Sequence, residues 1–245
     1  MDRKRLDKFL IDTGQMTSRS EAQAAIEAGK VFVNGRQALK ASEKVSPDDE
    51  VTSEKAHPYV SRAALKLKGA LDAFDCDVSG AVCLDVGCST GGFTEVLLEY
   101  GADHVFAVDV GRDQFHERLR TNHQITLYEQ TDARNLTEDL IDRPVDLVVC
   151  DASFIALEKV LNPALGFARA EATGVFLFKP QFQVGRKNVG KGGIVTDTQA
   201  VELARDSFAA WLEAQGWQIA SWALSVLKGA DGNQEWVVLA KKGAP

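Results

Sequence analysis

Five apolar runs of strand length between residues 82 and 180 constrain the fold more than any other feature of the sequence. The segments that separate these runs are long enough to cross over a sheet, as connections between parallel strands must. Strands of a parallel sheet are buried on both faces and therefore read as hydrophobic runs. The pattern predicts an α/β fold with a parallel, doubly wound sheet, whose strands lie in VCLDVG (82–87), HVFAVDVG (104–111), ITLYEQTD (125–132), VDLVVCDAS (145–153) and GVFLFKP (174–180).

Segments on both sides of these runs complete the expected domain. SRAALKLKGALDAF, which precedes the first run, places four apolar side chains on one helical face. Residues 197–215 predict a long amphipathic helix. Two further apolar segments, 217–227 and 234–242, follow with little between them, as an antiparallel pair would. Five parallel strands closed by an antiparallel hairpin are the architecture of class I, Rossmann-like methyltransferases.

The N-terminal residues predict a separate, small α+β domain. Apolar residues at helical spacing indicate a first helix, and Ser18 with Glu21 forms a capping box ahead of an alanine-rich second helix. An Asn-Gly dipeptide after alternating valines is a hairpin turn signal. A polar stretch with two prolines, 46–58, reads as the end of this unit and a linker. We therefore expect one domain over residues 1–57 and a second over 58–245.

Composition excludes several classes of protein. The N-terminus is too charged for a signal peptide, and no apolar run approaches the ~20 residues that span a membrane. The cytosol is therefore the expected compartment, and no membrane partner is expected. The four histidines share no ligand spacing, and no CxxC or His-pair spacing occurs among the cysteines, so we expect neither a metal site nor a disulfide framework. The cysteines are Cys76, Cys83, Cys88 and Cys150.

The distribution of charge bears on nucleic-acid binding. A net charge of −7 argues against nonspecific binding, which needs a basic surface. Residues 1–60 hold ten Lys/Arg and ten Asp/Glu, so the rest of the chain carries the whole negative charge. RNA binding is therefore expected through local patches, including a glycine-rich loop, QVGRKNVGKGG, that is a candidate lid. The candidate RNA-binding residues are Arg3, Lys4, Arg5, Arg19, Lys30, Arg62, Arg186, Lys187 and Lys191.

A glycine-rich loop, LDVGCSTGGF, follows the first strand-like run. Glycines let a ligand approach the backbone closely and free the helix N-terminus for contacts. The spacing departs from a dinucleotide fingerprint, and Asp85 before the first glycine can attract the ammonium of S-adenosylmethionine. Asp109, at the next strand end, can accept from both ribose hydroxyls, and Asp132 from the adenine amino group. The candidate cofactor residues are Asp85, Gly87, Ser89, Gly91, Gly92, Asp109 and Asp132.

Two lysines and two acids are expected to converge at one edge of the sheet. Asp151 ends the fourth strand and Lys179 the fifth, and a lysine that closes an apolar strand is costly unless it faces a site or a carboxylate. Glu235 opens the final, antiparallel strand at the same edge, and Lys66 lies one residue off the apolar face of the preceding helix. A ribose hydroxyl is a poor nucleophile, so methyl transfer from a sulfonium needs its proton removed or polarised and the reacting atoms held in line. A buried lysine could act as the base, with the carboxylates steering both lysines.

Each of these residues also has a purely structural explanation. The glycine loop could be a tight turn without a ligand, and a nicotinamide cofactor fits its spacing less well. Asp151 could cap the following helix, while Lys66 and Glu235, taken singly, read as solvated surface residues. Acids at three consecutive strand ends, together with four polar residues on one edge, favour the functional interpretation.

Several motifs of the chain resemble those of known families. RLDKFLIDTGQMTSRSEAQAAIEAGKVFVNG resembles the RNA-binding domain of the small-subunit ribosomal protein numbered four. YVSRAALKL, LDVGCSTGGFT, CDASF, FKPQF, VGKGGIV and GNQEW resemble, in order, the hemolysin-A-like (TlyA-type) rRNA methyltransferases, relatives of the FtsJ methyltransferases. The FtsJ relatives usually have proline after the catalytic aspartate region, where this chain has Ala152-Ser153-Phe154.

The resemblance implies a function and a site. The function is ribose 2′-O-methylation of a cytidine or other nucleotide in ribosomal RNA, with S-adenosylmethionine as cofactor and ribosomal RNA or ribosomal subunits as partners. The family's Lys-Asp-Lys-Glu tetrad carries over onto Lys66, Asp151, Lys179 and Glu235. Its cofactor site carries over onto Asp85, Gly87, Gly91, Asp109 and Asp132. The sequence specifies no oligomeric state.

Three other functions were weighed against this one. An amino-methyltransferase of RNA bases would use an (Asp/Asn)-Pro-Pro-(Tyr/Phe) turn. CDASF keeps Asp151 and Phe154 without the prolines, and that chemistry does not require Lys179. A membrane-lytic hemolysin, which the family name suggests, would need a signal peptide or a basic amphipathic segment, and neither is evident. A non-catalytic RNA-binding assembly factor would not need the tetrad.

Overall fold

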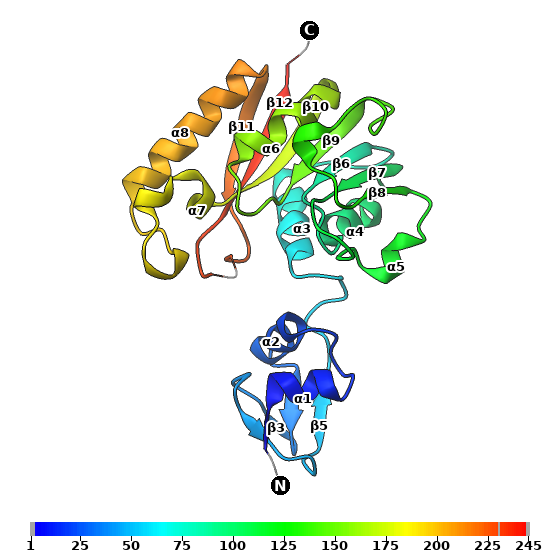
Figure 1. Cartoon of the computed structure of the whole chain (residues 1–245), viewed down its shortest axis with the longest axis vertical. Helices are drawn as coiled ribbons and strands as arrows, with labels where there is room; N and C mark the ends of the chain where they lie inside the picture. The colour runs from blue at the N-terminus through cyan, green and yellow to red at the C-terminus, as the bar shows by residue number, and fades with distance from the viewer. Residues whose placement is uncertain (1–2, 230, 244–245) are drawn as a thin grey trace. The chain divides into compact units, whose positions relative to one another are not determined.

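The structure is a computed structural model that describes residues 3–229 and 231–243. The contacts of the chain divide it into two compact units, Met1–Arg62 and Ala63–Pro245. Figure 1 shows the helices and strands of both units. Each unit buries a hydrophobic core of its own, as independent domains do.

The N-terminal unit packs two short helices against small antiparallel sheets. The side chain of Ser18 accepts from the N–H of Glu21, which confirms the predicted cap, whereas the Glu21 carboxylate turns back to the N–H of Thr17. Part of the stretch 46–58, which was expected to be a linker, forms strand β5 of the three-stranded sheet of this unit, whose order is β3-β2-β5. The elements are β1 (Lys4–Arg5), α1 (Leu6–Asp12), α2 (Arg19–Glu27), β2 (Val31–Val33), β3 (Arg36–Gln37), β4 (Lys44–Val45) and β5 (Val51–Ser53).

A seven-stranded sheet forms the centre of the second unit. Its order is β11-β12-β10-β9-β6-β7-β8, and β12 runs antiparallel to both of its neighbours while the pairs from β10 to β8 are parallel. The predicted class I, Rossmann-like fold with a small N-terminal α+β domain is confirmed. The strands are β6 (Val82–Val86), β7 (His104–Val108), β8 (Ile125–Tyr128), β9 (Val145–Cys150), β10 (Ala168–Phe178), β11 (Trp217–Leu224) and β12 (Trp236–Lys242).

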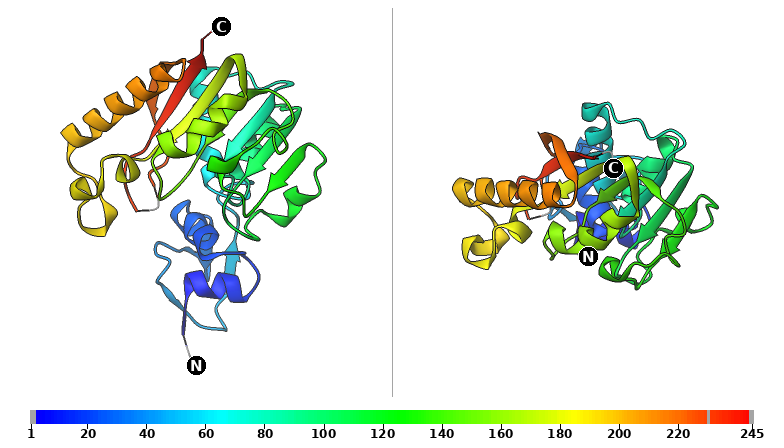
Figure 2. Two further views of the ribbon diagram at one scale, coloured as in Figure 1. Left: turned by 45° about the horizontal axis from the view of Figure 1, so that its top comes forward. Right: turned by 90° about the horizontal axis from the view of Figure 1, so that it is seen from above.

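Helices cover both faces of this sheet, with α6 and α8 on one face and α3 and α4 on the other (Figure 2). The longest helix, α8, begins with the side chain of Asp197 accepting from the N–H of Ala200, a favourable cap. The helices are α3 (Ala63–Phe74), α4 (Gly92–Glu99), α5 (Glu117–Arg120), α6 (Leu157–Ala164), α7 (Pro180–Gln183) and α8 (Thr198–Ala214), with 3-10 turns η1 (Ala133–Asn135), η2 (Leu165–Phe167), η3 (Arg186–Asn188) and η4 (Lys191–Gly193).

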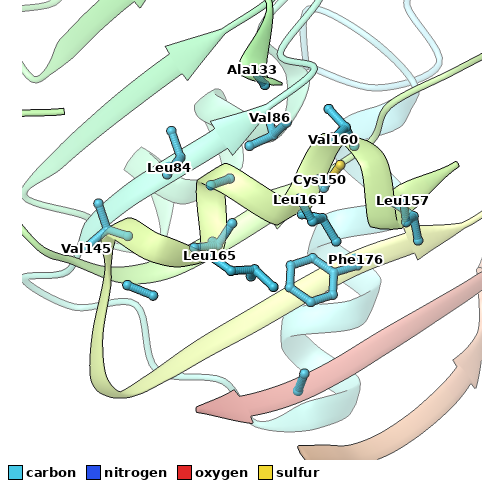
Figure 3. Close-up of a cluster of buried hydrophobic side chains, with 14 of the residues drawn as sticks. Leu84, Val86, Ala133, Val145, Cys150, Leu157, Val160, Leu161, Leu165 and Phe176 are labelled. Atoms are coloured by element: carbon cyan, nitrogen blue, oxygen red, sulfur yellow. The ribbon is translucent and has the colours of Figure 1, made fainter. Parts of the chain in front are cut away.

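Strand alternation decides which side chains fill the core beneath α6. Figure 3 shows Leu157, Val160 and Leu161 of α6 packed on side chains from β6, β9 and β10. Leu84 and Val86 of β6 lie in this core, so the residue between them points to the opposite face, toward α4. Each fully buried leucine or valine contributes roughly 1.5–3 kcal/mol. This core holds the strand ends, where the candidate site lies, in fixed positions.

Within the described part of the chain, no helix is both long enough and apolar enough to cross a membrane.

Candidate active site

Strand register brings three of the four candidate catalytic residues to neighbouring strand ends. Phe176 of β10 pairs with Cys150 of β9, and Phe178 pairs with Trp236 of β12. Asp151 and Lys179 follow directly after β9 and β10. Glu235 directly precedes β12 rather than lying within it, and its carbonyl accepts from the N–H of Ser225 over 2.9 Å. Because β12 is antiparallel, its start meets the ends of the parallel strands.

The four candidate catalytic side chains form two ion pairs, one buried and one whose carboxylate is partly exposed. Lys66 Nζ of α3 lies 2.5 Å from Glu235 Oε2, and the two side chains retain 8% and 2% of their exposure. Lys179 Nζ lies 2.5 Å from Asp151 Oδ1, a close charge contact that lacks the angles of a hydrogen bond. The same Nζ donates to Ser153 Oγ over 2.9 Å. Buried charges of this kind are costly unless paired, so each carboxylate holds one lysine in place.

A cavity of about 490 Å³ opens at the same sheet edge, between the ends of β6, β7, β8 and β9. This volume suits a ligand of nucleoside size. The cavity brings together five of the candidate residues, namely Gly87, Ser89, Asp109, Asp132 and Asp151. Gly91, Gly92 and Asp85 are not among its lining residues.

Two carboxylates in the cavity wall are fixed by hydrogen bonds. Asp109 Oδ2 accepts from the N–H of Ser89 over 2.9 Å, and Oδ1 accepts from the N–H of Gly111 over 2.6 Å. Asp132 caps η1 and pairs with Arg134, whose hydrogen bonds hold the pKa of Asp132 below its usual range. Each oxygen of the Asp109 carboxylate has a second lone pair and can still accept from a ligand. Both oxygens of Asp132 already accept from Arg134, so a ligand that binds Asp132 must replace one of these contacts.

Asp85 lies behind the cavity wall. It points toward α4, where Thr94 Oγ1 donates to its Oδ2 over 2.6 Å, and it is fully buried. Its Oδ1 has no hydrogen-bond partner among the described residues. Burial raises the pKa of Asp85 to about 7, because desolvation disfavours the charged form more than Thr94 supports it. A cation near Oδ1 would supply the missing partner.

The glycines of the loop after β6 have distinct structural reasons. Gly87 has a φ of 83°, and a Cβ there would lie 3.2 Å from the backbone N and Cα of Ala152. Because glycine has no Cβ, the loop lies directly against the segment that follows Asp151. Gly91 caps α4 with a φ of 92°, and its Cβ would lie 2.7 Å from Leu119 Cδ1. Gly92 is buried at the start of α4.

The candidate RNA-binding residues fall on both units. In the N-terminal unit, Arg5 and Arg19 converge on the buried carboxylate of Asp7, and hydrogen bonds, first from Arg5, lower the pKa of Asp7 to about 2. Arg3 is exposed, Lys4 pairs with Asp12, Lys30 pairs with Glu54, and Arg62 is half-buried. In the second unit, the exposed loop residues are Arg186, Lys187 and Lys191.

One aromatic residue of the site is not among the candidate site residues of the sequence analysis. Phe154 lines the cavity with 91% of its surface exposed and a φ of 66°, a strained conformation for a bulky residue. Its ring lies 5.3 Å from that of Phe182. The motif CDASF contains this residue, but no sequence pattern signals that its side chain is exposed. Thr94 and Arg134, which bind the two acids described above, were also missed, although Arg134 follows Asp132 by two positions.

The residues of the cavity fit S-adenosylmethionine. Across the described ranges, no three or more His, Cys, Asp or Glu side chains are grouped so that they could hold a metal ion. The cavity offers carboxylates for ribose and amino groups, and the unpaired oxygen of Asp85 lies behind its wall. These are acceptor groups, as a ligand with hydroxyls, an amine and a cationic centre requires.

The comparison with known proteins agrees with this geometry. A family model described as FtsJ-like methyltransferase matches residues 59–242, and one described as S4 domain matches residues 4–51. The chain is 45% identical over 238 residues to 16S/23S rRNA (cytidine-2′-O)-methyltransferase TlyA of Mycobacterium tuberculosis, covering 96% of this chain and 88% of the relative. It is 35% identical to Hemolysin A of Brachyspira hyodysenteriae, covering 95% of this chain and 98% of the relative.

A solved structure gives the same result. A protein from Streptococcus thermophilus, provisionally named a hemolysin, superposes with a TM-score of 0.78 at 32% identity, covering 99% of this chain and 90% of that one. The protein is an enzyme whose cofactor is S-adenosylmethionine and which has an RNA-binding S4 domain. With the sheet, the cavity and the paired lysines in place, the chain belongs to the FtsJ-like methyltransferase family.

Proposed function

We propose that this enzyme transfers a methyl group from S-adenosylmethionine to the ribose 2′-hydroxyl of a cytidine in ribosomal RNA, within the cytosol and on ribosomal subunits. The observation that carries the proposal is the ion pair of the buried Lys179 with Asp151, which lies in the wall of the cofactor cavity. The TlyA relatives, which are named as cytidine-2′-O-methyltransferases of rRNA, support the same substrate.

Lys179 is the proposed base. When bound, S-adenosylmethionine supplies an electrophilic methyl group on its sulfonium. Lys179 Nζ would accept the proton of the ribose hydroxyl as that oxygen takes up the methyl group, which leaves the proton on the lysine. Ser153 and Asp151 orient Nζ, and the Asp151 carboxylate stabilises the ammonium that results.

Lys66 and Glu235 form the second pair of the proposed tetrad. Glu235 is 2% exposed and holds Lys66 Nζ at 2.5 Å, so Lys66 is a fixed donor rather than a mobile surface cation. We assign it the role of fixing the reacting oxygen in line with the transferred methyl group, which requires a donor held within a few tenths of an ångström. Glu235 acts through Lys66.

The proposed cofactor contacts divide between the cavity wall and the layer behind it. Asp109 accepts from the ribose hydroxyls, Asp132 accepts from the adenine amino group, and the backbone from Gly87 to Gly92 approaches the methionine part. Asp85 lies outside the cavity lining, so we propose that it acts on the ammonium through its charge.

Phe154 and the N-terminal unit are proposed to handle the RNA. A target nucleotide must leave its stack to reach a buried base, and exposed aromatic rings stabilise such unstacked bases. Phe154, at the cavity and next in sequence to the Lys179 partner Ser153, is placed to do this. We propose residues 1–57 as the RNA-binding domain and linker and 58–245 as the methyltransferase domain.

The test is the identity of the methylated nucleoside. Purified enzyme and labelled S-adenosylmethionine are incubated with rRNA from cells that lack the gene, and the product is digested to nucleosides. We expect label in 2′-O-methylcytidine. Label in a base-methylated nucleoside would instead favour the amino-methyltransferase alternative, and no incorporation would favour a non-catalytic role.

A further inference from the structure

A buried asparagine joins two segments that lie far apart in the sequence. Asn233 is 3% exposed. Its side-chain Nδ2 donates to the carbonyl of Gly193 over 2.8 Å, and its Oδ1 accepts from the N–H of Val195 over 2.9 Å. Only a side-chain amide offers a donor and an acceptor in this arrangement, so neither a carboxylate nor an apolar side chain of equal size can replace it.

The segment that Asn233 holds is a short basic loop, residues 190–195. The loop is closed by a hydrogen bond of 2.9 Å from the N–H of Gly190 to the carbonyl of Ile194. Lys191 is exposed on it. Its main chain is therefore bonded within itself, and the Asn233 amide ties it to the segment that leads into β12.

That segment also carries Glu235. The carbonyl of Asn233 accepts from the N–H of Gly229 over 2.9 Å, and a Cβ on Gly229 would lie 2.6 Å from Glu235 Oε1. The chain is thus packed directly against the carboxylate that pairs with Lys66. A displacement of Asn233 is passed on to Glu235 over two residues of backbone.

We propose that Asn233 is a positioning residue that couples RNA contact by the 190–195 loop to the placement of the Lys66–Glu235 pair. This inference rests on the function proposed above. A phosphate bound by Lys191 fixes the loop, and the amide fixes the segment that carries Glu235. Asn233 is not among the lining residues of the cofactor cavity, so cofactor binding is independent of it.

The first experiment compares three variants of the full chain. Asn233→Leu removes both hydrogen bonds at similar volume, and Asn233→Asp keeps the acceptor for Val195 but loses the donor. The matched control is Asn122→Leu, because the Asn122 Oδ1 accepts from the N–H of Gln124 over 2.9 Å within its own turn, outside the cavity lining and the 190–195 loop. Asn233→Leu should lower kcat on the order of 10–100-fold and raise KM for rRNA, with the dissociation constant of S-adenosylmethionine unchanged. Asn233→Asp should be intermediate, and the control should stay within about twofold of wild type.

Double variants separate coupling from general damage. Lys191→Ala should raise KM for rRNA in the wild type but have little further effect in Asn233→Leu, and Glu235→Gln and Asn233→Leu should lower kcat less than additively. Strictly additive effects, or an unchanged kcat in Asn233→Leu, would overturn the proposal.

Hydrogen exchange tests the same link without methylation. In Asn233→Leu the N–H of Val195 loses its acceptor and should exchange faster, while added rRNA should slow its exchange in the wild type. If exchange at Val195 responds to the substitution and to rRNA as expected but the wild type methylates no ribose, the proposed function fails, while the link between the loop and the Glu235 segment stands. If it methylates normally and exchange at Val195 does not respond to the substitution, the link fails alone.

Discussion

The buried pair of Lys66 and Glu235 predicts a specific pattern of stability losses. Nζ and Oε2 are 2.5 Å apart, and with 8% and 2% of the side chains exposed, little water screens the charges. Removing one partner leaves the other charge buried and should cost about 3–5 kcal/mol of unfolding free energy. Lys66→Met and Glu235→Gln together remove both charges, so the double variant should cost at least ~2 kcal/mol less than the sum of the single losses.

Urea denaturation followed by tryptophan fluorescence measures this directly. All four tryptophans, at 211, 217, 222 and 236, lie in the second unit, so their signal reports the unfolding of that unit. Lys68→Met is the control, because its pair with Asp72 is exposed on the same helix and screened by solvent. Single variants that cost no more than this control, or losses that simply add, would refute the buried pair.

Three further predictions concern the cofactor site and the N-terminal unit. The pKa of Asp85 is raised to about 7, so the stability that this residue contributes is full below about pH 4 and is lost as pH rises through 7. Between pH 4.5 and 8, the free energy of unfolding of the wild type without cofactor should fall by roughly 3–4 kcal/mol relative to that of Asp85→Asn. Parallel pH profiles of the two proteins in urea denaturation would contradict this. Gly87→Leu should abolish detectable binding of S-adenosylmethionine in calorimetry, because the backbone of Ala152 leaves no room for a side chain. The control Gly80→Leu, at a left-handed glycine whose Cβ would meet nothing within 4 Å, should bind the cofactor normally, and equal affinities of the two variants would contradict the prediction. A chain without residues 1–57 should keep cofactor affinity but lose affinity for rRNA and much of its salt dependence, and unchanged rRNA binding in a filter assay would disprove the role of that unit.

The sheet was predictable because its signals are strong and local. Buried parallel strands are hydrophobic throughout, and each of the seven strands of the second unit contains an apolar run of the sequence. The structure extends β10 back to Ala168, which was not predictable because the first residues of the strand, ARAEAT, include an exposed stretch and carry no apolar pattern. In the N-terminal unit the hairpin of β2 and β3 was predictable from its Asn-Gly turn. The strands β1, β4 and β5 were not, since strands of two or three residues depend on their partners rather than on a pattern. For this reason β5 was taken as part of a linker.

The site was predictable in its composition but not in its contacts. Acids and lysines at strand ends indicated which residues meet, because strand direction places them on one edge. Which lysine pairs with which acid depends on helix placement and register, and these are tertiary properties. The orientation of Asp85 toward Thr94 follows from strand alternation. Because the strand is apolar on both faces, its sequence does not indicate which face Asp85 points to. The exposure of Phe154 arises from a backbone conformation that no residue pattern specifies.

The central claim is that Lys179 activates the ribose hydroxyl. Its most direct test is single-turnover transfer of labelled methyl to unmodified rRNA by wild type and Lys179→Ala, with cofactor and rRNA binding measured separately. General-base assistance is worth ~10²–10⁴-fold, and stabilisation confined to the transition state appears in the rate. We predict a loss of that size with both binding constants nearly unchanged, and a comparable loss for Asp151→Ala. A Lys179→Ala enzyme that transferred methyl at near wild-type rates would contradict the account and place the base elsewhere.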